Sequence, residues 1–204
     1  MVSFTNFERN QEMKNKKTVI IVAIVAIIAV IGVSLMSSYN SLVTGREAID
    51  SAASDIGANL QRRADLIPNV VSTVKSFAKH ETEVFDKVLE ARTALINANS
   101  LEDKAEADAQ LNSALQGINV IVENYPELKS DATYVALMDE LEGSENRIAV
   151  SRKDYNDAVK AYNNKVIRFP GSITAKIFGF EKAEYFEADE ESQTVPDVGA
   201  ALGE

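Results

Sequence analysis

The sequence predicts an all-α protein with an N-terminal transmembrane helix followed by an antiparallel up-and-down four-helix bundle. Residues 18–36 form one apolar run without a charge. Beyond it, apolar residues recur at helical spacing, and no segment shows the alternation of a strand. The chain of 204 residues has nine Gly and four Pro, which is typical of an ordinary folded protein.

The apolar run reads TVIIVAIVAIIAVIGVSLM, which is 19 residues. At 1.5 Å per residue it makes a helix of roughly 28 Å, close to the thickness of a bilayer core. A cleaved signal peptide usually has only ~7 to 15 apolar residues, and a buried core helix usually keeps a polar face. An uncleaved anchor is therefore favoured, although Gly32-x-Ser34 leaves cleavage open as the alternative.

The charges beside this run predict its orientation. Arg9, Lys14, Lys16 and Lys17 precede it, and no charge follows until Arg46. The positive-inside rule then keeps the N-terminus in the cytoplasm. We expect a single-pass protein of the cell membrane with its bundle on the extracytoplasmic side.

The chain divides into four predicted parts. Residues 1–17 form a cytoplasmic tail, 18–36 the transmembrane helix, 37–186 the bundle and 187–204 an acidic tail. The last part carries six acidic residues and no Lys or Arg, a composition typical of disorder.

Within the bundle, we expect helices over about 39–67, 68–97, 101–122 and 130–169. Proline lacks an N–H and disfavours helix in the preceding residue, so Pro68 is predicted to end the first helix. One rod over residues 39–97 would reach roughly 90 Å, beyond the ~60 Å of the last helix. Ser100-x-x-Asp103 resembles a capping box. The last helix carries a seven-residue repeat: Tyr134, Leu141, Ile148, Tyr155, Tyr162 and Phe169.

Beside this repeat, Glu145 and Arg152 occupy positions where a bundle ordinarily has Leu or Val. Buried charges need partners. The favoured interpretation is a structural polar network; a metal or ligand site and a solvated face are the alternatives. The residues assigned to the network are Arg62, Arg63, Asp65, Glu81, Arg92, Glu145 and Arg152.

The end of the last helix should return to the membrane, and aromatic residues concentrate there. Together with Lys176 and Lys182 they have the composition of a membrane-interface segment. The alternative is that the rings cap the open end of the bundle. The residues concerned are Phe169, Phe178, Phe180, Tyr185 and Phe186.

Several motifs resemble the LemA family, in order over residues 39–188. The first half has Tyr39-Asn40-x-Leu42-Val43, Gln61-Arg62-Arg63-x-Asp65-Leu66-Ile67-Pro68-Asn69, Ala78-Lys79-His80-Glu81 and Glu90-Ala91-Arg92. The second half has Glu123-Asn124-Tyr125-Pro126-Glu127-Leu128-Lys129, Glu145-Asn146-Arg147-Ile148-Ala149, Arg152-x-x-Tyr155-Asn156, Phe169-Pro170, Phe178-Gly179-Phe180 and Tyr185-Phe186-Glu187-Ala188. Gly45 and Gly57 depart from the bulkier residues usual in the family, which is expected to loosen packing.

The resemblance implies a bacterial membrane-anchored helical bundle without an established activity or cofactor. Magnetosome proteins similar to this family have been connected with building a membrane compartment, and family members often occur beside membrane proteins with TPM domains. By this analogy the expected partners are the lipid bilayer, through residues 18–36, and other membrane proteins, TPM-domain proteins among them. A homo-oligomer is a further option.

The amino-acid composition and net charge argue against several classes of functional site and partner. The chain has no Cys and one His, which excludes disulfides, zinc clusters and motifs that need two imidazoles. A formal net charge of -10 argues against nucleic acid as a partner. Di-iron bundles use Glu-x-x-His, but Phe77 stands three residues before His80. We therefore expect a non-enzymatic scaffold or interaction module without a cofactor or metal. The alternative is sensing of divalent cations or of the envelope state through the acidic bundle surface.

For His80 and for the acidic cluster after Ser100, the simpler interpretation is a solvent-exposed surface position without a specific function. His80 beside Glu81 could titrate as a pH switch, but a surface histidine is the simpler interpretation. The acidic cluster from Glu102 to Asp108 is expected to be a solvated helix start, where carboxylates complement the helix dipole.

Overall fold

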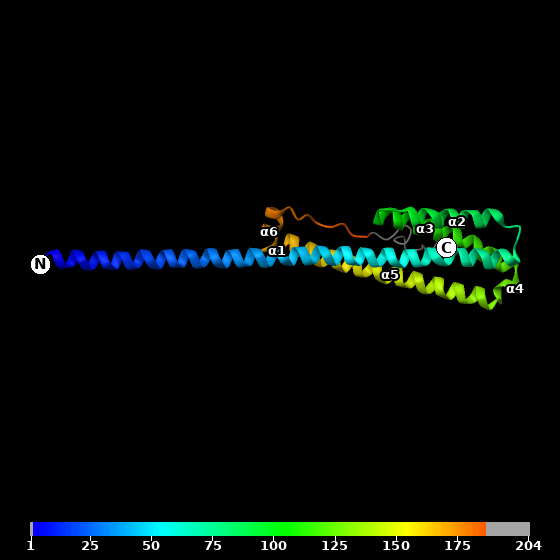
Figure 1. Ribbon diagram of the computed structural model, residues 1–204, viewed down its shortest axis with the longest axis horizontal. Coiled ribbons are helices and arrows are strands. Elements are labelled where there is room, and N and C mark those ends of the chain that lie inside the picture. Colours follow the sequence, from blue (N-terminus) through cyan, green and yellow to red (C-terminus); the bar gives the residue numbers. More distant parts are fainter. Residues whose placement is uncertain (1, 187–204) are drawn as a thin grey trace, which may run out of the picture. The chain divides into compact units, whose positions relative to one another are not determined.

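The computed structural model describes the backbone of residues 2–186 and the side chains of residues 19–186. The predicted acidic tail, 187–204, lies outside the described residues. Within residues 2–186 the chain is helical and contains no strand, so the all-α prediction is confirmed. The helices are α1 (Val2–Phe77), α2 (Thr82–Asn97), α3 (Leu101–Asn124), α4 (Pro126–Lys129), α5 (Ala132–Ile167) and α6 (Gly171–Phe178) (Figure 1).

The described chain divides into two compact units. The anchor unit contains residues up to Glu47 together with Ala161–Ala183. The core unit contains Ala48–Lys160 and the described residues that follow Ala183. Two of the three divisions fall inside helices, since α1 and α5 each contribute to both units, and the third lies between Ala183 and Glu184, after α6.

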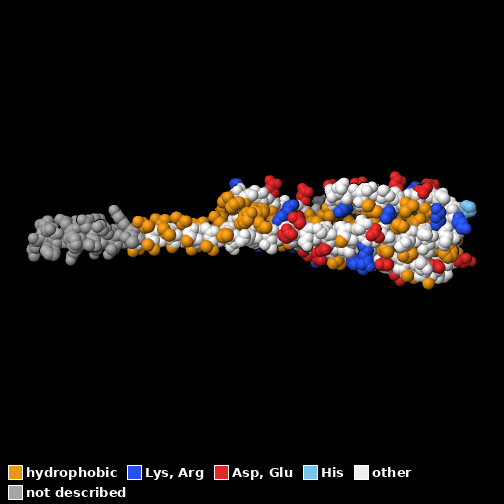
Figure 2. Space-filling view, viewed as in Figure 1, with side chains coloured by type: hydrophobic (Ala, Val, Ile, Leu, Met, Phe, Trp, Pro, Cys, Tyr) orange, Lys and Arg blue, Asp and Glu red, His pale blue; other side chains and the backbone are white. Residues whose placement is uncertain are grey.

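The first part of α1 is apolar and exposed. Its most apolar window of 18 residues has a mean hydropathy of 3.2, and none of that window is buried. Val19 is 68% exposed and Val33 71%, and the visible face of this stretch carries hydrophobic side chains and no charged one (Figure 2). By length and composition, α1 is the candidate membrane span in the part of the chain that the structure describes.

Helix α1 does not end at Pro68, so the predicted boundary between residues 67 and 68 is wrong. The helix continues to Phe77, and the chain turns over residues 78–81. Pro68 lacks the N–H that would bond to the carbonyl of Ala64, a fully buried residue. Arg92 of α2 replaces that donor: its Nε lies 2.8 Å from the Ala64 oxygen. Because the orphaned carbonyl has a partner, the helix passes through the proline.

The expected reversal of the chain does occur, ten residues later than predicted. From Tyr39, α1 runs for about 58 Å, and α5 is about 54 Å long. The single rod over residues 39–97 was rightly rejected, but the turn that shortens it is Ala78–Glu81.

The hydrophobic centre of the core unit draws on five helices. The capping box at Ser100 and Asp103 is present, with Asp103 N–H donating to Ser100 Oγ at 2.9 Å. Of the seven-residue repeat, Phe169 is 81% exposed because α5 ends at Ile167. Core residues include Ile56, Leu60, Ile67, Val70 and Val74 of α1, Phe85 and Val88 of α2, Leu111 and Ile118 of α3, Leu128 of α4, and Tyr134, Leu141 and Ile148 of α5.

We expect Arg92→Met to lower the free energy of unfolding by about 1–3 kcal/mol, because it leaves the buried Ala64 carbonyl without a donor. Pro68→Ala restores an N–H to that carbonyl, so it should recover most of the loss in the double variant. Urea unfolding of the full chain in detergent, followed by circular dichroism, measures both. Arg62→Met, which removes an exposed arginine, is the matched control. Equal losses with and without Pro68 would contradict this account.

Candidate functional site

A cluster of charged side chains lies inside the core unit and joins α1, α3 and α5. Arg63 Nη1 donates to Asp108 Oδ1 at 2.6 Å, and Arg152 Nη2 donates to Asp108 Oδ2 at 2.9 Å. Arg63 Nη2 also donates to Asn112 and, at 3.3 Å, to Glu145 Oε2. Asp108 therefore has a guanidinium on each of its oxygens.

The cluster is deeply buried at one end and open at the other. The side chains of Arg63 and Asp108 are 1% and 3% exposed, Arg152 is 29% and Glu145 is 57%. Burial raises the pKa of the Asp108 carboxyl, while the charges of Arg63 and Arg152 oppose that shift. With two cations and two carboxylates the group is neutral overall, which limits the cost of burying its charges.

The structure brings together only part of the predicted network. Arg63, Glu145 and Arg152 meet through Asp108. Arg62 forms an exposed ion pair with Glu140 at 3.0 Å.

The other three residues of that prediction lie elsewhere. Arg92 binds the Ala64 carbonyl, and Asp65 accepts a hydrogen bond from Gln61 at 2.9 Å on an exposed surface. Glu81, also assigned to the network, is the residue that precedes α2. The alternative of a solvated face thus describes Arg62 and Asp65, whereas Arg63 is buried.

Asp108, the centre of the cluster, was misassigned to a solvated helix start. It is 2% exposed. The signal was present in the spacing, because Asp108 stands three residues before Leu111 on the stripe that continues through Leu115, Ile118 and Val122. An acidic residue on a buried stripe requires a cationic partner, and the sequence offers Arg63 and Arg152.

A second site on α5 holds the chain segment 180–186, here called the strap. In the anchor unit, Asn163 Nδ2 donates to the Ala183 carbonyl at 2.9 Å, and the Ala183 N–H donates to Asn163 Oδ1 at 2.8 Å. Tyr162 Oη donates to the Glu181 carbonyl at 2.9 Å. These bonds recognise backbone groups only.

The same arrangement recurs seven residues earlier, in the core unit. Asn156 exchanges two hydrogen bonds, of 2.9 and 2.8 Å, with the backbone of Phe186. Tyr155 Oη donates to the Glu184 carbonyl at 3.2 Å. The repeated Tyr-Asn pair was the signal for the strap, but sequence reasoning assigned both tyrosines to an apolar seam.

Two glycines give the strap its path in the anchor unit. Gly179 ends α6 with a φ of 74°, in the left-handed region that glycine tolerates best. A Cβ on Gly45 would lie 3.1 Å from the Tyr162 ring. The glycine expected to loosen packing therefore admits this ring beside α1. Burial raises the pKa of the Tyr162 phenol, which favours its protonated, donating form.

The aromatic residues assigned to a membrane interface have different surroundings. In the anchor unit, Phe178 and Phe180 pack edge-on to Tyr39, at centroid distances of 4.9 and 5.6 Å, and Phe178 is 55% exposed. Phe169 and Tyr185 are exposed. Phe186 belongs to the core unit and stacks on the Arg152 guanidinium at 4.8 Å.

No group of three or more carboxylate or histidine side chains that could hold a metal ion occurs among the residues whose side chains are described. His80 is exposed, in the turn between α1 and α2.

We expect Asp108→Asn to cost about 3–5 kcal/mol, because it removes the anion between two guanidiniums of which Arg63 is buried. Glu145→Gln, the matched change at the exposed end, should cost at most ~1 kcal/mol. Arg152→Ala should fall between them, since Arg152 is only partly buried. Chemical unfolding of the full chain in detergent gives the order. Similar midpoints for the two amide variants would show that the cluster is not a buried ionic network.

Comparison with known proteins gives the chain its family. The model of the LemA family matches residues 52–199. Magnetosome protein MamQ 2 of Paramagnetospirillum magneticum is 30% identical over 180 residues, covering 76% of this chain and 66% of that protein. MamQ of Magnetospirillum gryphiswaldense is 27% identical, with 75% and 66% covered. Protein LemA of Metamycoplasma hominis is 24% identical, with 74% and 69% covered. The chain thus spans slightly less than two thirds of the length of the MamQ proteins. The matched region contains both the charge cluster and the strap, and the chain belongs to the LemA family.

Proposed function

We propose that this protein is a membrane-anchored scaffold, a non-enzymatic interaction module that organises other membrane proteins. The observation that carries the proposal is that α1 contains both the exposed apolar stretch and the core positions Ile56 to Val74 in one helix. Anchor and core are joined by helix and not by a loop. A scaffold requires such a continuous attachment between its membrane anchor and its folded part.

We further propose that α1, α2, α3 and α5 make an antiparallel up-and-down four-helix bundle. The five-helix core, which includes the short α4, supports this arrangement. The Arg63–Asp108 pair would set the register of α1 against α3, because a one-turn slip would strand both charges. Glu145 and Arg152 add α5 to the same register.

The proposed topology places the N-terminus in the cytoplasm and the core unit outside the cell membrane. The four basic residues before residue 18 support it. We propose that the exposed rings Phe169, Phe178 and Tyr185 and the partly exposed Phe180 touch the membrane interface. Phe186 is left out of this group because its ring covers Arg152.

The proposed partners are other membrane proteins. Two relatives are named magnetosome proteins, and the family resemblance implies neighbours with TPM domains. Valines on α3 and α5 of the core unit offer apolar contact points, since Val120 and Val150 are each 59% exposed. Cation sensing through the acidic surface lacks a comparable observation in its favour.

The absence of cysteine permits a clean test of topology. We expect Lys129→Cys, on α4 of the core unit, to react with a membrane-impermeant maleimide on intact cells, because the core unit faces outward. Ser3→Cys should react only after permeabilisation, because it precedes the anchor. The opposite pattern of labelling would reverse the assignment.

Site-specific photocrosslinking in intact membranes tests the scaffold role. A photoreactive residue at Val120 or Val150 should give a discrete protein adduct, because these exposed apolar side chains are the proposed contact points. The same probe at Lys153, which is exposed and paired with Asp157, is the control. Mass spectrometry identifies the partner. Lipid adducts alone, or equal labelling at all three positions, would count against a scaffold.

A further inference from the structure

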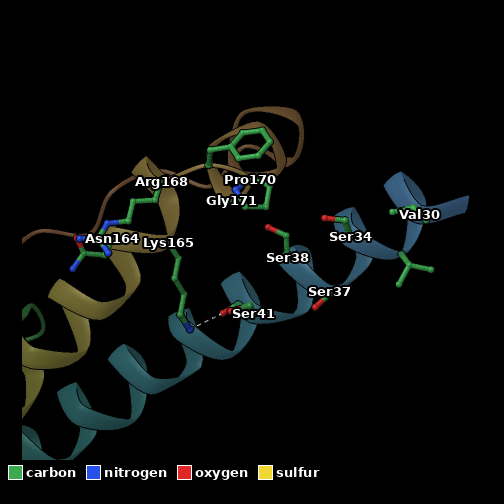
Figure 3. Close-up of a pocket in the computed structure, with 12 residues that line it drawn as sticks. Val30, Ser34, Ser37, Ser38, Ser41, Asn164, Lys165, Arg168, Pro170 and Gly171 are labelled. Atoms are coloured by element: carbon green, nitrogen blue, oxygen red, sulfur yellow. Dashed lines mark hydrogen bonds between the residues drawn. The ribbon is translucent and has the colours of Figure 1, made fainter. Parts of the chain in front are cut away.

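A groove of about 660 Å³ opens in the anchor unit between α1 and the segment that joins α5 to α6. Its volume lies in the range of small-ligand sites. On one side, Val30, Ser34, Ser38 and Ser41 form a stripe along α1, spaced by four, four and three residues. Figure 3 shows Ser34 and Ser38 projecting toward Pro170 and Gly171 on the opposite side.

The polarity of the groove changes along α1. Val30 and Val33 belong to the exposed apolar stretch, whereas Ser37, Ser38 and Ser41 follow its end at residue 36. At 1.5 Å per residue, Ser41 lies about 8 Å beyond that end. A bilayer adds about 5–7 Å of polar headgroups to each side of its hydrocarbon core. Ser37 and Ser38 therefore fall at the level of the headgroups, and Ser41 at their outer edge, when the apolar stretch spans a membrane.

Two cations line the headgroup end of the groove. Lys165 Nζ donates to the Ser41 carbonyl at 3.2 Å, which holds the ammonium beside the serines (Figure 3). Arg168 follows the last residue of α5 and also lines the groove. Within residues 19–186, neither side chain is in an ion pair.

The charge of this segment is opposite to that of the chain. Residues 161–183 contain four basic residues, Lys165, Arg168, Lys176 and Lys182, and one acidic residue, Glu181. The whole chain carries a formal charge of -10. Exposed apolar side chains, Ile173 at 47% and Ile177 at 62%, accompany Lys176 on α6. A local positive charge beside exposed apolar surface complements an anionic amphiphile.

We propose that this groove binds the headgroup of an anionic phospholipid, with the phosphate between Lys165 and Arg168, its oxygens accepting from the serine hydroxyls, and an acyl chain along Val30 and Val33. The inference rests on the proposed membrane anchoring and adds a specific lipid to it. The groove would hold a lipid from the leaflet that contacts the end of the apolar stretch, and it would fasten the end of α5 to the membrane surface.

Native mass spectrometry of the full chain, released from detergent with equal amounts of phosphatidylglycerol and phosphatidylcholine, measures the preference directly. The parent chain should retain phosphatidylglycerol preferentially. Each basic residue contributes roughly a fivefold preference, so Lys165→Gln/Arg168→Gln should lower the ratio more than tenfold. Lys129→Gln/Arg147→Gln removes the same charge from exposed positions of the core unit and should leave the ratio unchanged.

A second variant distinguishes lipid binding inside the groove from a general attraction of anionic lipids to the basic residues. Ser34→Leu/Ser38→Leu fills the groove without changing any charge, and it should also lower retention of phosphatidylglycerol. An unchanged ratio in both groove variants, an equal loss in the control, or no preference in the parent chain would overturn the proposal. If alkaline carbonate extracted the parent chain from membranes, the proposed anchoring would be wrong. This measurement therefore distinguishes a failure of the anchoring proposal from a failure of the lipid-binding proposal.

Discussion

The continuity of α1 depends on one hydrogen bond, from Arg92 Nε to the carbonyl of Ala64. A proline in the middle of a helix orphans the carbonyl four residues before it, and at a buried position water cannot satisfy that group. Here a side chain from the neighbouring helix supplies the donor. The same bond also ties α2 to α1, beside the core contacts of Phe85 and Val88. The apolar stretch and the core consequently belong to one uninterrupted element.

The buried charges of the Asp108 cluster restrict how the helices of the core unit can shift along one another. Hydrophobic stripes tolerate small shifts of one helix along another, because one apolar side chain can replace the next at modest cost. A carboxylate between two guanidiniums does not tolerate them, because each charge that loses its partner remains buried. The graded exposure from Arg63 to Glu145 lets the outermost carboxylate stay hydrated while it still contacts the buried arginine.

Helical periodicity was sufficient to predict the class of fold and most of the core. In the seven-residue repeat, Tyr134, Leu141, Ile148 and Tyr162 are buried as their spacing predicts. The boundary at Pro68 could not be predicted, because the donor that rescues the helix lies 28 residues away on another helix. Asp108 was accessible to the same spacing argument, but composition favoured a solvated cluster. The strap was not predicted because the rings of Tyr155 and Tyr162 fit the apolar seven-residue repeat. Their hydroxyls nevertheless donate hydrogen bonds to backbone carbonyls of the strap.

The hydrogen bonds that hold the strap to α5 all engage its backbone groups, and the rings of Phe180 and Phe186 pack on Tyr39 and Arg152. Asn163 binds the N–H and the carbonyl of Ala183, and Asn156 binds those of Phe186. These four hydrogen bonds involve no side chain of the strap. Residues 181–184 can therefore diverge in sequence while these hydrogen bonds are preserved, provided that residue 183 is not proline. Selection would act on the two asparagines and on the spacing of three residues between their targets. Related sequences should then keep the two asparagines of α5 and the rings of Phe180 and Phe186, and vary at residues 181–184 between those rings.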